Sequence, residues 1–216
     1  MPASTQGPDT SKPIPRLRRS SKKTADRIDD IAHEHPCQRI EIWFEDEARF
    51  GQKGTLTTVW AAQGSRPTAV RQTQYDYLWV IAAACPATGA TAGIIMPSLD
   101  TDVINLFLQE FSRQLAPNVQ AVLIWDGAAF HTSKSLVVPE NVTLLRLPPY
   151  SPELNPIENL WHYLRSHYWS NRSYPDWDAL KEAAVAGLVT VGTDAERIKT
   201  VCAAPYIAGL ERAGTI

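Results

Sequence analysis

Three acidic residues stand where a predicted strand ends or a predicted helix begins. Asp46 closes an alternating apolar run, Asp126 closes a continuous apolar run, and Glu158 lies in the first turn of a helix. Carboxylates at the ends of adjacent strands can converge with one from a helix packed over them. Hard divalent cations such as Mg²⁺ need such oxygen ligands, and two ions roughly 3.5–4 Å apart can activate a nucleophile and stabilise a leaving oxygen on phosphorus. The pattern therefore indicates a candidate site for metal-assisted phosphoryl transfer.

Each acid also has a structural interpretation. Asp126 precedes a glycine and fits a turn, whereas Glu158 follows Asn155 at the spacing of a capping box. The run Glu45-Asp46-Glu47 could be a solvated acidic cluster. Alternation favours Asp46 within that cluster, because its two acidic neighbours fall on the face opposite the apolar residues of the strand.

The elements that must position these acids follow from hydrophobic periodicity. A mixed sheet of the α/β (α+β) class is expected, with helices on both faces because the buried runs need cover on both sides. The predicted strands span residues 40–46, 57–62, 75–84, 92–96, 119–125 and 142–147, and the predicted helices begin at residues 24, 101, 156, 177 and 194.

Length and composition indicate one globular domain. The chain has 216 residues, 44% of them hydrophobic, and a formal charge of −2. We expect residues 1–36 to form a basic, Pro-rich, mostly disordered arm with a short lead-in helix, and residues 37–216 to form the main domain. Three well-separated cysteines and the absence of an apolar signal segment favour a reduced, cytoplasmic protein.

An uncharged stretch from residue 77 to residue 99 is long enough to cross a membrane. Its middle, Pro86-Ala87-Thr88-Gly89, is a turn sequence, so we interpret the stretch as two short buried strands joined as a hairpin. No membrane association is expected.

Basic residues are concentrated rather than spread evenly. Residues 48–75 contain no Asp or Glu but carry Arg49, Lys53, Arg66 and Arg71, which suits contacts with DNA phosphates. A solvated face is the alternative, and the basic arm could likewise be a solubilising tail or a contact with a polyanion. The distribution of charge, not its total of −2, bears on whether the partner is a nucleic acid.

Three sequence blocks resemble the catalytic blocks of DDE transposases. The resemblance is to the mariner superfamily in its bacterial insertion-sequence branch, the insertion-sequence-630 group. The blocks are FEDEARFG (44–51), IWDGAAFHT (124–132) and, most specific, LPPYSPELNPIENLW (147–161); Trp60, Gly64 and Pro67 also look like the second and third strand region of that family.

The resemblance implies an RNase-H-like fold in which Asp46, Asp126 and Glu158 bind two Mg²⁺ or Mn²⁺ ions. It further implies that a metal-bound water cuts DNA at a transposon end and that the freed 3′-hydroxyl attacks target DNA. His131 would lie near the metals, as a contact to DNA phosphate or as a cap of the following turn.

The chain also departs from this family. Members carry N-terminal helix-turn-helix domains, and none fits into residues 1–36, so the DNA-reading part is expected in a separate chain or reading frame. Related enzymes act as dimers on DNA, and we expect cytoplasmic, nucleoid-associated activity. The alternatives are a catalytically silent, domesticated DNA-binding relative and another RNase-H-like metal nuclease.

Overall fold

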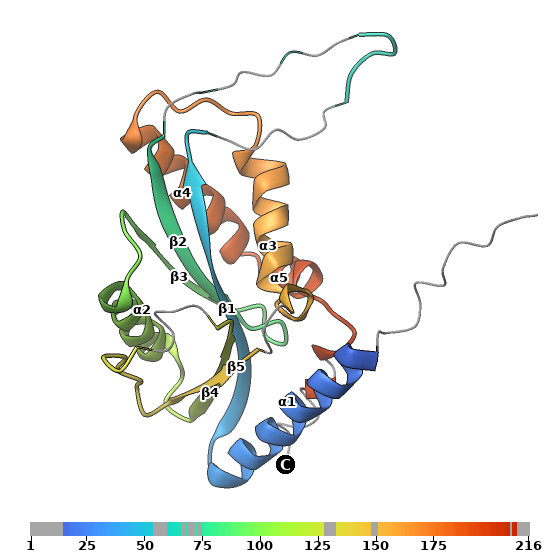
Figure 1. The fold of residues 1–216 in the computed structure, drawn as a ribbon, viewed down its shortest axis with the longest axis vertical. Coiled ribbons are helices and arrows are strands. Elements are labelled where there is room, and N and C mark those ends of the chain that lie inside the picture. The colour runs from blue at the N-terminus through green and yellow to red at the C-terminus, as the bar shows by residue number, and fades with distance from the viewer. Residues whose placement is uncertain are drawn as a thin grey trace, which may run out of the picture.

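A single mixed sheet organises the chain (Figure 1). The computed structural model describes residues 15–53, 60–65, 68, 72, 75–127, 133–147, 151–207 and 209–210. The five strands are ordered β3-β2-β1-β4-β5. Their bounds are β1 Arg39–Gly51, β2 Tyr77–Ala84, β3 Thr91–Met96, β4 Val119–Trp125 and β5 Val142–Arg146.

The central strand β1 is paired differently on its two sides. It runs parallel to β4, with Phe44 opposite Ile124 as the last pair. It runs antiparallel to β2, and that pairing continues from Phe44 as far as Gly51. The parallel half is completed by β4 and β5, which pair from Ala121 onward. Every residue of β4 is buried, as expected of an interior parallel strand.

The strands β2 and β3 form the antiparallel hairpin that the turn sequence predicts. Gly89 has φ +76° in this turn, and a Cβ there would lie 2.3 Å from the backbone oxygen of Ala195. Only glycine satisfies both conditions without a shift of the backbone. The uncharged stretch is thus accounted for by two strands, and no helix among the described residues is long and apolar enough to cross a membrane.

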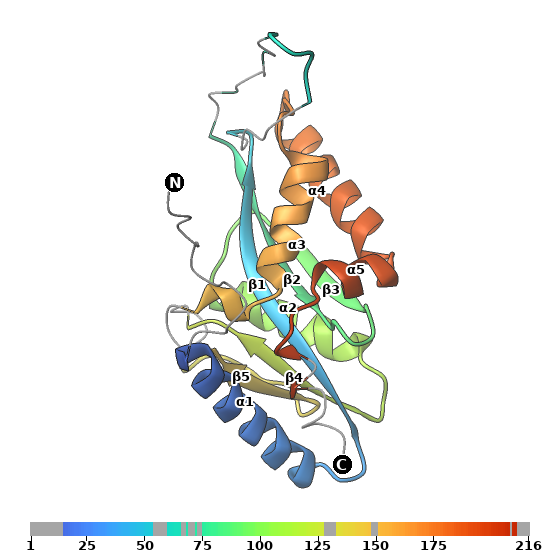
Figure 2. The same ribbon diagram turned by 90° about the vertical axis from the view of Figure 1, so that its right-hand side faces the viewer.

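Helices cover both faces of the sheet, as Figure 2 shows from the side. One face is covered by α2 (Thr101–Gln114), whose Phe107 and Phe111 pack on β4 and its neighbours. The opposite face is covered by four helices that share one apolar core. These are α1 (Pro15–Glu34), α3 (Ile157–Leu164), α4 (Trp177–Gly192) and α5 (Ala195–Val201).

The described structure differs from the sequence prediction near the N-terminus. The first helix begins at Pro15 rather than Thr24, so residues from 15 onward are helical where a disordered arm was expected. Its Ile28 and Ile31 are fully buried in the core shared with α3 and α4, which explains why this helix is held on the domain.

The predicted strand at residues 57–62 is not found where it can be tested. Residues 57–59 lie outside the described residues, and residues 60–62 have no regular secondary structure. Trp60, expected in a strand, is fully exposed, and Gly64 occupies a turn with φ +82°. Pro67 lies outside the described residues.

Candidate active site

Asp46 lies at the point where the pairing of β1 changes. The prediction that Asp46 ends its strand is wrong, because β2 continues to pair with β1 for five residues beyond it, to Gly51. The parallel pairing with β4, however, stops at Phe44, two residues before Asp46. The side chain of Asp46 is half-buried and lies on the sheet face that α3 covers, since Phe44 and Ala48 of that face belong to the core beneath α3.

Asp126 directly follows the last residue of β4 and is exposed. It stands two residues beyond Ile124, as Asp46 stands two residues beyond Phe44, and those two residues are paired. The parallel register therefore brings the two aspartates to the same level of the sheet. At this level β1 and β4 are no longer paired with each other.

Glu158 lies in the first turn of α3 and is exposed. The capping box does not form, because among the described residues no side-chain hydrogen bond links Glu158 to the backbone N–H of Asn155. Asn155 instead accepts from the N–H of Ile157 at 3.2 Å. The carboxylate of Glu158 consequently does not cap the N-terminus of α3.

Two side chains join α3 to β1 on either side of Glu158. Asn155, which is buried, donates from Nδ2 to the backbone oxygen of Glu45 at 2.8 Å. Trp161 donates from Nε1 to Oδ2 of Asp46 at 2.9 Å. Asn155 lies two residues before α3, whereas Glu158 and Trp161 are three residues apart within it and so are neighbours on the helix surface. Glu158 is thereby held between two attachments to the strand that carries Asp46.

The electrostatics show that these carboxylates lie close together. The pKa of Asp46 is raised to about 7, first by burial and then by the negative charges of Glu158 and Glu47, against the lowering effect of the hydrogen bond from Trp161. Part of this rise therefore reflects negative charge around Asp46 that no cation compensates. A cation bound there would remove that repulsion.

Glu45 is fully buried behind this site, so the solvated interpretation of the acidic cluster is wrong for it. Its pKa is raised well above the usual value, first by burial and then by the charges of Glu47, Asp46 and Asp126.

The donor set fits Mg²⁺ or Mn²⁺ in its chemistry. Asp46, Asp126 and Glu158 offer only carboxylate oxygens, the ligands that these cations prefer. Within the described residues, no three Asp, Glu, His or Cys side chains lie close enough together to hold a metal ion. The structure brings Asp46 near Glu158 and Asp126 near Glu45, as the charge effects on their pKa values indicate, without closing a three-carboxylate centre.

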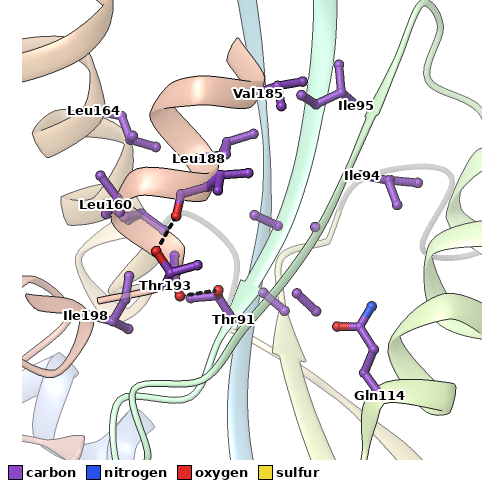
Figure 3. Close-up of a pocket in the computed structure, with 17 residues that line it drawn as sticks. Thr91, Ile94, Ile95, Gln114, Leu160, Leu164, Val185, Leu188, Thr193 and Ile198 are labelled. Carbon is purple, nitrogen blue, oxygen red and sulfur yellow. Dashed lines mark hydrogen bonds between the residues drawn. The ribbon is translucent and has the colours of Figure 1, made fainter. Parts of the chain in front are cut away.

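Two cavities flank α3 on its two sides. One, of about 370 Å³, is lined by polar residues that include Glu158, by Pro156 and Ala204, and by Tyr206, whose hydroxyl donates to the backbone oxygen of Leu154 at 2.8 Å. The other, of about 520 Å³, lies between α4 and the β2–β3 hairpin (Figure 3). Aliphatic side chains such as Leu160 and Val185 line it, and none of its lining residues is titratable. Of these two cavities, the first alone has titratable lining side chains.

The predicted DNA-contacting residues are partly described. Arg49 and Lys53 are exposed at the far end of β1, where each lies over a tyrosine ring. Arg66, Arg71 and His131 lie outside the described residues.

Sequence reasoning missed the residues that hold the acids in place. Sequence patterns indicate Asn155 only as a helix cap and Trp161 only as the last residue of the block 147–161, and they do not predict the burial of Glu45. Spacing carried a signal, because Asn155 and Trp161 flank Glu158 at intervals of three, but their partners on β1 are more than 100 residues away.

Comparison with known sequences gives one family and two relatives. The model of the family described as DDE superfamily endonuclease matches residues 41–181. The uncharacterized protein y4pE/y4sA of Sinorhizobium fredii is 42% identical over 102 residues, which cover 47% of this chain and 76% of that protein. The Tc3 transposase of the transposable element in Caenorhabditis elegans is 43% identical over 61 residues, 26% of this chain and 18% of that protein.

Solved structures share the fold at low sequence identity. A pre-cleavage Mos1 transpososome matches with a TM-score of 0.58 and 12% identity, covering 100% of this chain and 68% of that chain. The Mos1 mariner paired-end complex with Mn matches with a TM-score of 0.57 and 12% identity, covering 99% and 68%. In the Mos1 strand transfer complex the TM-score is 0.55 at 14% identity, and the chain spans 64% of that protein.

These likenesses agree with the predicted RNase-H-like mixed sheet. The matched family region contains all but the first two residues of β1 and the whole of β4 and α3, and with them Asp46, Asp126 and Glu158. The chain therefore belongs to the DDE superfamily of endonucleases.

Proposed function

We propose that this protein is the catalytic part of a transposase of the insertion-sequence-630 group, which cuts DNA at transposon ends and joins the 3′-hydroxyl to target DNA. The observation that carries this proposal is the fixed approach of Glu158 to Asp46. Trp161 and Asn155 attach the helix with one acid to the strand with the other. Such attachment is what a site needs if it must hold its ligands within a fraction of an ångström.

Asp46, Asp126 and Glu158 would hold two Mg²⁺ or Mn²⁺ ions. Solved Mos1 paired-end complexes with Mg and with Mn support the choice of these ions for this chain. Bound, the ions would supply Lewis-acid activation of the attacking oxygen and stabilisation of the leaving oxygen.

The residues of the chain itself supply orientation and a suitable electrostatic field. Trp161 fixes one oxygen of Asp46, so that the other faces away from the indole. Asn155 fixes the start of α3 and thus the direction of Glu158. The charges of Asp46 and Glu158 repel a phosphodiester, so divalent cations are expected to be needed for a phosphodiester to reach these carboxylates, whereas basic residues elsewhere on the surface can bind DNA without them.

DNA is the proposed substrate and partner. The Mos1 structures are described as paired-end and strand transfer complexes, which supports binding of transposon ends and of target DNA by this chain. We further propose that a separate helix-turn-helix part or reading frame reads the end sequence, that the protein acts as a dimer on DNA, and that it works in the cytoplasm at the nucleoid.

A strand-transfer assay with Mn²⁺ on terminal-repeat DNA tests the proposed function. The full chain is used, supplemented with the helix-turn-helix part if one is found. Asp126→Asn keeps the shape of the side chain and removes its charge, so product formation should fall by at least about 10³-fold. Activity that survives this substitution would contradict the assignment of the three acids. DNA binding without any cutting by the wild-type protein would favour the catalytically silent relative.

A further inference from the structure

A small cavity of about 50 Å³ lies at the end of β1, beyond the carboxylates. Its walls come from β1 and from the π-helical turn η3 (Arg165–Trp169), which continues α3. Three of its lining residues are basic, namely Arg49, Lys53 and Arg165, and none is acidic. The cavity is therefore positive, whereas the site around Asp46 is negative.

The positive charge of this cavity is not neutralised by carboxylates. Within the described part of the chain, none of the three basic side chains forms a salt bridge. Arg49 lies 4.7 Å from the ring centre of Tyr77 and Lys53 lies 5.1 Å from that of Tyr75. An aromatic ring orients a cation without cancelling its charge. These cations remain available to an external anion.

The cavity is aligned with the candidate active site. Strand β1 and helix α3 run alongside each other toward the same end of the molecule (Figures 1 and 2). Two contacts join β1 to this helical segment. Trp161 donates a hydrogen bond to Asp46, and the ring of Trp169 packs on that of Phe50 with 4.6 Å between the ring centres. From Trp161 to Trp169 the helical segment rises about 12 Å, and from Asp46 to Phe50 the strand rises about 13 Å. The two elements therefore run parallel over this length.

Arg165 follows Glu158 by seven residues, which places it two turns along nearly the same side of the helix. The separation is about 10 Å along the helix axis. Successive phosphates of one DNA strand advance about 3.4 Å along the duplex axis. A duplex whose axis runs parallel to this seam advances about three base pairs over that separation, so a phosphate at Arg165 lies within a few nucleotides of one near Glu158.

We propose that the cavity lined by Arg49, Lys53 and Arg165 is a binding subsite for a backbone phosphate of DNA, within a few nucleotides of the reacting phosphate. This inference rests on the proposed function and adds a register to it. The subsite reads no base, because a phosphate contact carries no sequence information. It fixes which phosphodiester reaches the carboxylates.

Equilibrium binding of fluorescent duplex DNA to the full-length protein, in EDTA and at 0.05–0.5 M salt, tests the subsite. Arg165→Gln should lower the magnitude of the slope of log K against log salt by about 1, and affinity at 0.1 M salt by about tenfold. Arg113→Gln is the matched control, because Arg113 is an exposed arginine on α2 and pairs with Glu110. Arg165→Lys should restore most of the affinity.

Neutral methylphosphonates placed one at a time along the DNA strand test the register. In the wild-type protein, one neutral linkage two to four nucleotides from the scissile position should weaken binding. In Arg165→Gln that linkage should have no further effect, because the partner charge is already gone. Additive losses at every position would overturn the subsite.

The two proposals fail in different ways. If the wild-type protein binds no DNA at any salt concentration, the proposed function fails and the subsite fails with it. If the wild-type protein binds DNA with a normal salt dependence and Arg165→Gln behaves like Arg113→Gln, only the subsite is wrong. Circular dichroism of each variant checks that the fold is kept.

Discussion

The indole Nε1 of Trp161 donates a hydrogen bond to Oδ2 of Asp46 at 2.9 Å, joining the helix of one candidate metal ligand to the strand of another. The indole is almost fully buried. Its N–H therefore has one available acceptor, and Asp46 loses rotational freedom. Residues behind a ligand set its orientation and commonly change metal affinity by 10- to 100-fold.

Trp161→Phe should weaken Mn²⁺ binding and slow strand transfer by about tenfold or more, because the N–H is lost while an aromatic ring stays in the core. Isothermal titration with Mn²⁺ and a transfer assay measure the two effects. Trp169→Phe is a matched control, since Nε1 of Trp169 is buried without an acceptor in the described structure. Equal losses in the two variants would mean that Trp161 acts only through packing.

Asn155→Asp should destabilise the fold by about 1–3 kcal/mol, because a buried donor to the Glu45 carbonyl is replaced by a charge. Urea unfolding in EDTA measures the change. Asn159→Asp adds the same charge to the same helix at an exposed position, so its unfolding midpoint should stay close to that of the wild type. If both variants unfold at the same urea concentration, the link to β1 contributes no stability.

The thiol of Cys37 should react with alkylating reagents in the native protein, whereas those of Cys85 and Cys202 should not. Burial raises the pKa of Cys202 to about 12 and also raises that of Cys85, so neither forms appreciable thiolate at pH 8. Cys37 is exposed. Native protein treated with iodoacetamide at pH 8 should be alkylated at Cys37 alone, as peptide mass spectrometry would show, and at all three cysteines in urea. Rapid labelling of Cys202 in the native protein would contradict its burial.

Gly187→Ala should lower stability by about 1–3 kcal/mol although alanine favours helix. A Cβ at this position would lie 2.7 Å from Nε1 of Trp169, which packs on β1 at the end of the cavity. Thermal unfolding measures the effect. Ala186→Gly, at an exposed neighbouring position, changes only helix propensity and should cost about 1 kcal/mol. A more stable Gly187→Ala variant would show that α4 has room to move.

Local patterns predicted most elements of the fold. β4 has the predicted bounds, and α2 and α4 agree to within a residue or so, because apolar periodicity and side-chain caps such as Asp100 act over a few residues. The length of β1 was underestimated because its last five residues are held by pairing with β2, a partner 26 or more residues away.

Spacing and motif predict the candidate acids, but they do not predict that Asn155 and Trp161 hold these acids in place. That Glu158 approaches Asp46 depends on the packing of α3 over β1, which no local pattern encodes. The same holds for the burial of Glu45, whose neighbours Asp46 and Glu47 are only partly buried. Long-range contacts therefore decide the electrostatics of the site even where the residue types are evident.

The pairing of β1 also bears on how such a protein can change during evolution. The antiparallel register from Phe44 to Gly51 fixes the face on which Asp46 lies, independently of the residues between Gly51 and Tyr77. Insertions or deletions in that connection would leave the acid in place, whereas a one-residue slip within β1 would turn it to the other face of the sheet. Changes in the length of that connection are thus compatible with Asp46 keeping its face of the sheet.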